Sequence, residues 1–108
     1  MRCLMLALAL LAPSAATAVA EQSDMRILRG EALACGMCAE CHAIGRGGES
    51  PHVAAPPFRT LERRLDLDSF LDRLRQGLTS GHPDMPTFRF TRDDARALIA
   101  YLRSIQGP

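Results

Sequence analysis

The stretch Cys38-Ala39-Glu40-Cys41-His42 decides how the rest of this chain folds. Two cysteines separated by two residues and followed at once by a histidine match the pattern for covalent attachment of a c-type haem. One helical turn presents both thiols to the vinyl groups at the porphyrin edge, and the histidine reaches the iron from one side as proximal ligand. The motif therefore predicts one haem, attached through Cys38 and Cys41 and ligated by His42.

Two other interpretations of these cysteines are weaker. A zinc site could draw on Cys35, Cys38, Cys41 and His42, but all four lie within eight residues and no second ligand pair follows at the spacing of a zinc module. A thioredoxin-like C-x-x-C needs a βαβ context, which this sequence lacks. The haem interpretation is therefore favoured.

Residues 1–20 predict a secretory signal peptide. Arg2 supplies the basic n-region, residues 4–12 the apolar core, and Ala18-Val19-Ala20 fits the cleavage pattern of small residues. The strongly apolar residues stop at Leu11, which is well short of the roughly 20 that a spanning helix needs. We therefore expect cleavage after Ala20, export to the periplasm without stable membrane insertion, and a mature domain of residues 21–108.

Size and charge limit what the mature domain can be. The 108 residues allow one domain, and 88 remain after cleavage, so a core of side chains alone would be thin and a buried porphyrin would supply the missing apolar mass. All 13 basic residues are arginines, set against 12 acidic residues. Loss of Arg2 leaves the mature chain formally neutral, so nothing predicts nucleic-acid binding.

Hydrophobic periodicity and capping residues predict a first helix over about Asp24 to Gly36, with Asp24 as its N-cap. Gly30 falls in the middle of this helix, where glycine costs ~1 kcal/mol relative to alanine. Close approach of another helix would explain why a residue without a Cβ stands there.

Two further helices are predicted towards the C-terminus. One runs from Ser69 to about Gln76, with Asp68 as N-cap and Gly77 as the stop. The last begins after Thr91, which forms a variant of the capping box with Asp94. Its predicted buried face consists of Ala95, Leu98, Ile99, Leu102 and Ile105, with Tyr101 beside it.

The segment after His42 is too rich in glycine and proline for a long helix or a central strand. We expect it to wrap around one edge of the haem with Phe58 turned inwards. The carbonyl of Pro56 or of Pro57 is free to accept a hydrogen bond from His42 Nδ1, which would fix the orientation of the ligand.

What fills the sixth coordination position decides the chemistry of the iron. Met85 is the favoured candidate, because Asp84 and Pro86 flank it in a stiff loop that could aim its thioether at the metal. His52 and His82 are the alternatives, together with an open site.

The haem motif, the later Gly81-His82-Pro83-Asp84-Met85-Pro86 and the terminal Leu98-Ile99-Ala100-Tyr101-Leu102 resemble the class I cytochromes c, in the small soluble bacterial subset. Gly30 and Tyr101 stand where this family keeps a glycine and an aromatic residue for the crossing of its first and last helices. The resemblance implies an all-α fold of three to four helices wrapped around one covalently attached haem c, with His42 and Met85 as axial ligands.

The resemblance also implies the other residues and the partners of the site. A proline carbonyl supports the ligand histidine, for which we take Pro57, and Arg59 is the first candidate for a haem propionate, ahead of Arg63 and Arg46. The chain has none of the lysines through which mitochondrial members dock. Cys35 lies outside the attachment motif. It is either a small buried apolar residue or a functional one, such as a redox-active thiol or the site of a dimer disulfide.

These features predict a monomeric, non-enzymatic carrier of single electrons. It would dock transiently at the haem edge with an oxidase, reductase or dehydrogenase. The alternative is a haem sensor or a small peroxidase-like protein with an open or exchangeable sixth ligand.

Overall fold

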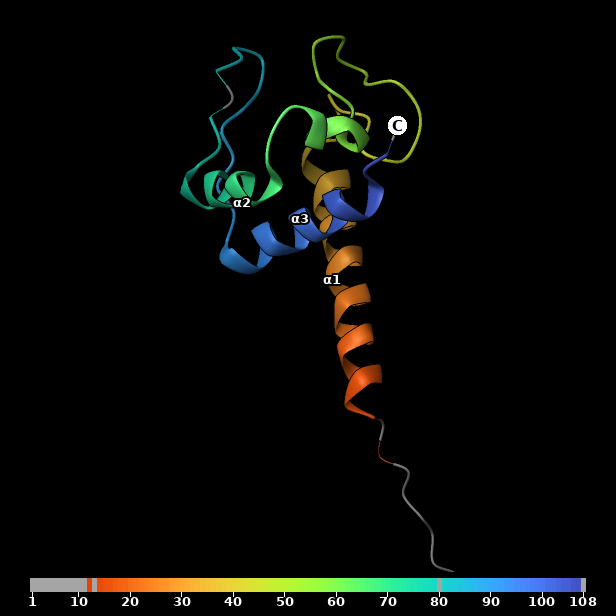
Figure 1. Cartoon of the computed structure of the whole chain (residues 1–108). Helices are drawn as coiled ribbons and strands as arrows, with labels where there is room; N and C mark the ends of the chain where they lie inside the picture. Colours follow the sequence, from red (N-terminus) through yellow and green to blue (C-terminus); the bar gives the residue numbers. More distant parts are fainter. Residues whose placement is uncertain (1–11, 13, 80, 108) are drawn as a thin grey trace, which may run out of the picture.

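A computed structural model of the chain describes residues 12, 14–79 and 81–107. These residues form four helices and the loops between them. The helices are α1 (Ala15–Met37), the 3-10 helix η1 (Phe58–Arg63), α2 (Leu67–Gln76) and α3 (Arg92–Ile105) (Figure 1). Across these residues there is no strand, only an isolated bridge between Leu78 and Phe88. The predicted all-α fold of three to four helices is confirmed.

Helix α1 begins earlier than the sequence pattern predicted. Its N-cap is Ser14, so the assignment of that role to Asp24 was wrong. A run of small residues that includes four alanines precedes Asp24, and alanine is the strongest helix former, so the helix continues backwards into it. The first half of α1 consequently extends away from the other helices (Figure 1).

The predicted signal peptide lies partly outside the described residues. Its basic residue Arg2 and its apolar run up to Leu11 are not described, and the expected cleavage after Ala20 falls inside α1 and stays a prediction. Among the residues that the structure describes, no helix combines the length and the apolar character needed to cross a membrane.

Helices α1 and α3 cross at Gly30, as predicted, and α3 runs across α1 in Figure 1. A Cβ built on Gly30 would lie 2.7 Å from the Cβ of Tyr101 and would collide with the backbone carbonyl of Ala97. Beside the crossing, Arg29 Nε donates to Asp94 Oδ1 at 2.8 Å. The glycine therefore has a packing function, because only hydrogen fits between the two helices at this point.

The predictions for α3 are confirmed. The hydroxyl of Thr91 accepts a hydrogen bond from the backbone N–H of Asp94 at 3.2 Å, and this caps the first turn. Two aspartates in the first turn and Arg103 in the last complement the helix dipole. The predicted face is buried, and it contains Ala95, Leu98, Ile99, Tyr101, Leu102 and Ile105.

Helix α2 has its N-cap two residues before the predicted position. The carboxylate of Asp66 accepts from the backbone N–H of Ser69 at 2.7 Å, so Asp68 lies in the first turn and pairs instead with Arg103. Both aspartates stand close to the start of the apolar pattern, and the backbone path selects the earlier one. Gly77 ends the helix as predicted, at a φ of 103° that favours glycine.

Tyr101 links α3 to the loop after His42, because its hydroxyl donates to the carbonyl oxygen of Ile44 at 2.8 Å. We expect Tyr101→Phe to lower the free energy of unfolding by about 1 kcal/mol, since the ring stays packed while the carbonyl loses its partner. Chemical denaturation of the haem-containing protein measures this change. Tyr101→Leu should cost more, because it also removes ring contacts at the crossing. A Phe variant as stable as the parent protein would contradict the assigned role of the hydroxyl.

Candidate haem-binding site

A cavity of about 570 Å³ lies among the C-terminal end of α1, η1, α2, α3 and the loops beside them. Its volume falls within the range of pockets that hold organic cofactors. Its walls are mostly apolar, with Phe58, Leu61, Leu65, Phe70, Leu74, Leu78, Phe88, Phe90 and Leu98 among the lining side chains. In so small a chain, an apolar cavity of this size is a place for a ligand and not a packing defect.

The attachment motif forms one wall of this cavity, and Cys38, Cys41 and His42 all line it. Cys38 is the C-cap of α1, and its backbone N–H donates to Ala34 at 2.9 Å. The N–H of His42 then donates to the carbonyl of Cys38 at 2.9 Å, so the helical turn continues through the motif. Burial, with a smaller contribution from Cys41, raises the pKa of the Cys38 thiol to about 11 in the polypeptide. Cys38 is thus a partly buried residue in the lining of the cavity.

Contacts with Pro56 and Phe58 fix the orientation of the His42 ring. Its Nδ1 donates to the carbonyl oxygen of Pro56 at 2.8 Å, and its ring centroid lies 4.9 Å from that of Phe58. Of the two prolines that the sequence offered, Pro56 is the acceptor, which corrects the choice of Pro57. The carbonyl of Pro57 instead accepts from the backbone N–H and the hydroxyl of Thr60, in the first turn of η1. With Nδ1 engaged, Nε2 is the nitrogen left for a metal.

Met85 lines the same cavity as His42 and is partly buried against the core. Its backbone N–H donates to the carbonyl of His82 at 3.2 Å, which folds the segment into a turn. His52 and His82, the alternative ligands, also line the cavity. Both ring nitrogens of His52 are engaged, one with the carboxylate of Asp84 at 3.2 Å and the other with the backbone N–H of Ala54 at 3.1 Å. The structure therefore brings the imidazole of His42 and the thioether of Met85 to one space.

Comparison with known proteins identifies the family. Residues 26–102, more than two-thirds of the chain, match the family described as cytochrome C oxidase, cbb3-type, subunit III. The chain belongs to this family of c-type cytochromes. It is also 34% identical over 104 residues to cytochrome c-552 of Bradyrhizobium diazoefficiens. The aligned residues cover 96% of this chain and 91% of that protein. No solved structure matches the chain.

Family membership confirms three predictions about this cytochrome. It is a small monohaem cytochrome of class I, its cofactor is a covalently attached haem c, and its general role is electron transfer. The donor set around the cavity fits that cofactor. Two thiols stand on one wall, an imidazole is oriented through its second nitrogen, a thioether lines the same space, and the remaining surface is largely apolar.

The structure does not bring Arg59, the predicted propionate partner, to the cavity. Its guanidinium donates to the carbonyl of Gly48 at 2.8 Å, and Arg46 and Arg63 likewise donate to backbone carbonyls near the C-terminus. The arginine that lines the cavity is Arg73, whose guanidinium carbon lies 6.0 Å from the ring centre of Phe70. No feature of the sequence indicates Arg73, because a charged residue on an amphipathic helix ordinarily faces water.

Cys35 does not line the haem cavity. Cys35 is exposed on α1, so its interpretation as a small buried residue was wrong. Within the described part of the chain, no three histidine, cysteine or acidic side chains gather closely enough to hold a metal ion. The four residues of the zinc alternative are therefore not arranged as a zinc site.

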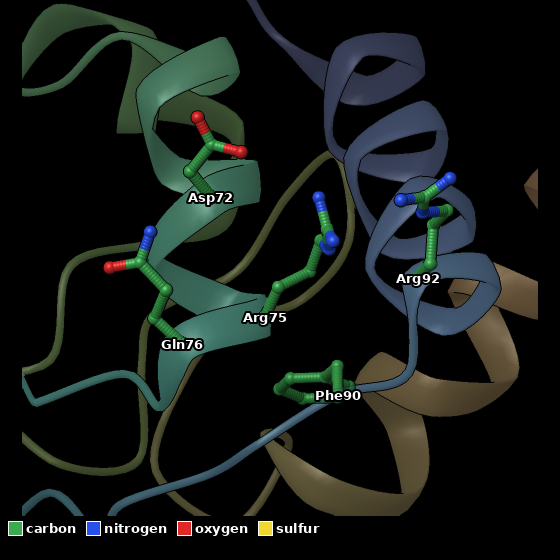
Figure 2. Close-up of a pocket in the computed structure, with 5 residues that line it drawn as sticks. All are labelled: Asp72, Arg75, Gln76, Phe90 and Arg92. Atoms are coloured by element: carbon green, nitrogen blue, oxygen red, sulfur yellow. The ribbon is translucent and has the colours of Figure 1, made fainter.

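A second pocket, of about 340 Å³, lies between α2 and the start of α3. In Figure 2, Arg75 reaches from α2 into the space between the helices, and Phe90 lies below it on the segment that leads into α3. Asp72, Gln76 and Arg92 complete the lining. Phe90 lines both this pocket and the haem cavity, but no residue predicted for the haem site lines the second pocket. It is therefore a charged surface recess that adjoins the cytochrome's cofactor cavity.

Proposed function

We propose that this cytochrome is a periplasmic carrier of single electrons, with its haem attached through Cys38 and Cys41 and ligated by His42 and Met85. The observation that carries the proposal is that all four residues line one cavity. A thioether opposite an imidazole favours the ferrous state and raises the reduction potential relative to ligation by two histidines.

The residues of the cavity suit outer-sphere electron transfer and do not suit catalysis. The haem, when bound, supplies a one-electron iron couple. The carbonyl of Pro56 holds His42 in one orientation, and the ring of Phe58 packs beside it, so the proximal ligand moves little. With Met85 as the sixth ligand, no coordination position at the iron would remain for a substrate or a gas. The apolar walls exclude water, which limits the reorganisation that accompanies each change of charge.

Redox proteins are the partners of such a carrier, and the edge of the haem near Cys38 and Cys41 is the proposed contact. The matched family is described as a subunit of a cbb3-type oxidase, which makes a terminal oxidase one candidate for the electron acceptor. The other candidates are reductases and dehydrogenases. We propose that the cytochrome acts as a monomer and that the contact is small and short-lived, as is usual for electron-transfer pairs.

Absorption spectra of the exported, haem-loaded protein test this function. We expect low-spin spectra in both oxidation states, a weak thioether-to-iron charge-transfer band in the ferric form, and no change on addition of carbon monoxide. High-spin iron or ready binding of carbon monoxide would contradict the proposal. The sixth position would then be open or exchangeable, as in a sensor or a small peroxidase-like protein.

A further inference from the structure

We propose that His52 is a positioning residue for Met85. Its hydrogen bond to Asp84, which we call the clasp, holds the loop that carries Met85 and so keeps the thioether in the haem cavity. This inference rests on the proposed ligation by Met85. It concerns two loops that are distant in sequence, the proximal loop (residues 43–57) and the Met85 loop (residues 81–87). Both lie at the end of the molecule opposite the first half of α1, the former yellow-green and the latter teal in Figure 1.

The backbone of His52 is fixed to the attachment motif. Its N–H donates to the carbonyl of Cys41 at 3.1 Å, and its own carbonyl accepts from the N–H of Ala55 at 3.0 Å. These bonds hold the residue in a turn beside the wall that carries the thiols. The side chain of His52 consequently starts from a position that is rigidly related to the motif.

The imidazole of His52 is oriented for one contact. Its Nδ1 accepts the backbone N–H of Ala54 at 3.1 Å, so the ring proton lies on Nε2. Nε2 donates that proton to the carboxylate of Asp84 at 3.2 Å. The ring of His82 meets the same imidazole edge-on, with 6.1 Å between the ring centroids. His52 therefore bridges from the proximal loop to the residue that directly precedes Met85.

The Met85 loop depends on contacts of this kind. At its base, the N–H of Leu78 donates to the carbonyl of Phe88 at 2.8 Å. Between these residues, Pro83 and Pro86 have no N–H to donate, and the N–H of Met85 is used inside the loop. The bond from His52 reaches the loop near its tip, beside the thioether. Movement of Met85 out of the cavity must therefore stretch or break it.

The clasp is partly exposed, which sets the size of its effect. The side chain of His52 is 33% exposed and that of Asp84 is 64% exposed. Pairs of this exposure contribute modestly, so loss of the clasp should favour departure of Met85 by about two- to fivefold. A change of that size is measurable kinetically and leaves the fold intact.

The rate at which imidazole binds to the ferric, haem-loaded protein tests the clasp, because Met85 must leave before an external ligand can enter. We expect His52→Ala to raise this rate about two- to fivefold. We also expect faster amide hydrogen exchange in peptides that cover residues 81–88. His52→Gln should restore part of the protection, since its amide nitrogen can still donate to Asp84. Val53→Ala is the matched control, because Val53 is the neighbouring residue and is fully exposed.

A double-mutant cycle separates the clasp from general effects of either substitution. If the contact is responsible, His52→Ala should change little in a protein that already carries Asp84→Ala. Equal rates for His52→Ala and Val53→Ala, or additive effects in the cycle, would overturn the inference. A failure of the proposed ligation is seen separately, because Met85→Ala would then leave the spectrum of the parent protein unchanged.

Discussion

Replacing Met85 with alanine should abolish the low-spin methionine-ligated spectrum and lower the reduction potential. The thioether is the soft ligand that favours ferrous iron, and alanine leaves only solvent or a neighbouring side chain in its place. Since axial ligands set haem potentials over a range of ~0.8 V, we expect a decrease on the order of 0.1 V. Ferric absorption spectra and a spectroelectrochemical titration measure the two effects.

A matched control for this substitution is Met25→Ala. Met25 lies on α1 with 65% of its surface exposed, so its loss removes a thioether far from any buried contact and should change neither measurement. His82 also lines the cavity and is the side chain that could replace the lost ligand. The double variant Met85→Ala/His82→Ala should therefore show high-spin iron. A Met85→Ala protein that retains the charge-transfer band would eliminate Met85 as the ligand.

Gly30→Ala should produce the largest loss of stability among small substitutions in this chain. Alanine is ordinarily the better helix former by ~1 kcal/mol. At this position, however, its methyl group collides with the Ala97 carbonyl and the Tyr101 Cβ, both of which belong to a packed helix and cannot turn aside. We expect a net decrease of about 1–3 kcal/mol in the free energy of unfolding, because the two helices must separate.

Thermal or chemical unfolding of the haem-loaded protein measures the effect of this substitution. Gly47→Ala provides the control. Gly47 lies in the exposed proximal loop, and a Cβ there meets nothing within 4 Å. That variant should be as stable as the parent protein or slightly more stable, since alanine reduces the freedom of the unfolded chain. Equal stability of both variants would show that the helices do not depend on the close approach.

The features that the sequence predicted correctly are those with a local cause. The spacing within Cys38-Ala39-Glu40-Cys41-His42 is itself the chemistry of attachment, and Thr91 caps the helix that begins at the next residue. Gly30 was informative for a different reason. A glycine inside a helix requires an explanation, and a close helix crossing is the usual one.

The features that the sequence missed depend on the path of the backbone between distant residues. Asp66 and Asp68 are equally good caps by composition, and only the turn before α2 selects the first. Pro56 and Pro57 differ by one residue, yet their carbonyls point to His42 and to Thr60 respectively. The distance from Arg59 to the haem cavity likewise depends on how η1 folds back, and this has no signature in the residue order.

The crossing at Gly30 also constrains when this protein can fold. Its two partners, Gly30 and Ala97, are 67 residues apart, so the contact joins the beginning of the cytochrome domain to its end. The helix that leads into the attachment motif packs chiefly against α3, the last helix of the domain. Closing so long a loop is slow and entropically costly. We therefore expect the crossing of α1 and α3 to form late in folding, after the local contacts within each helix.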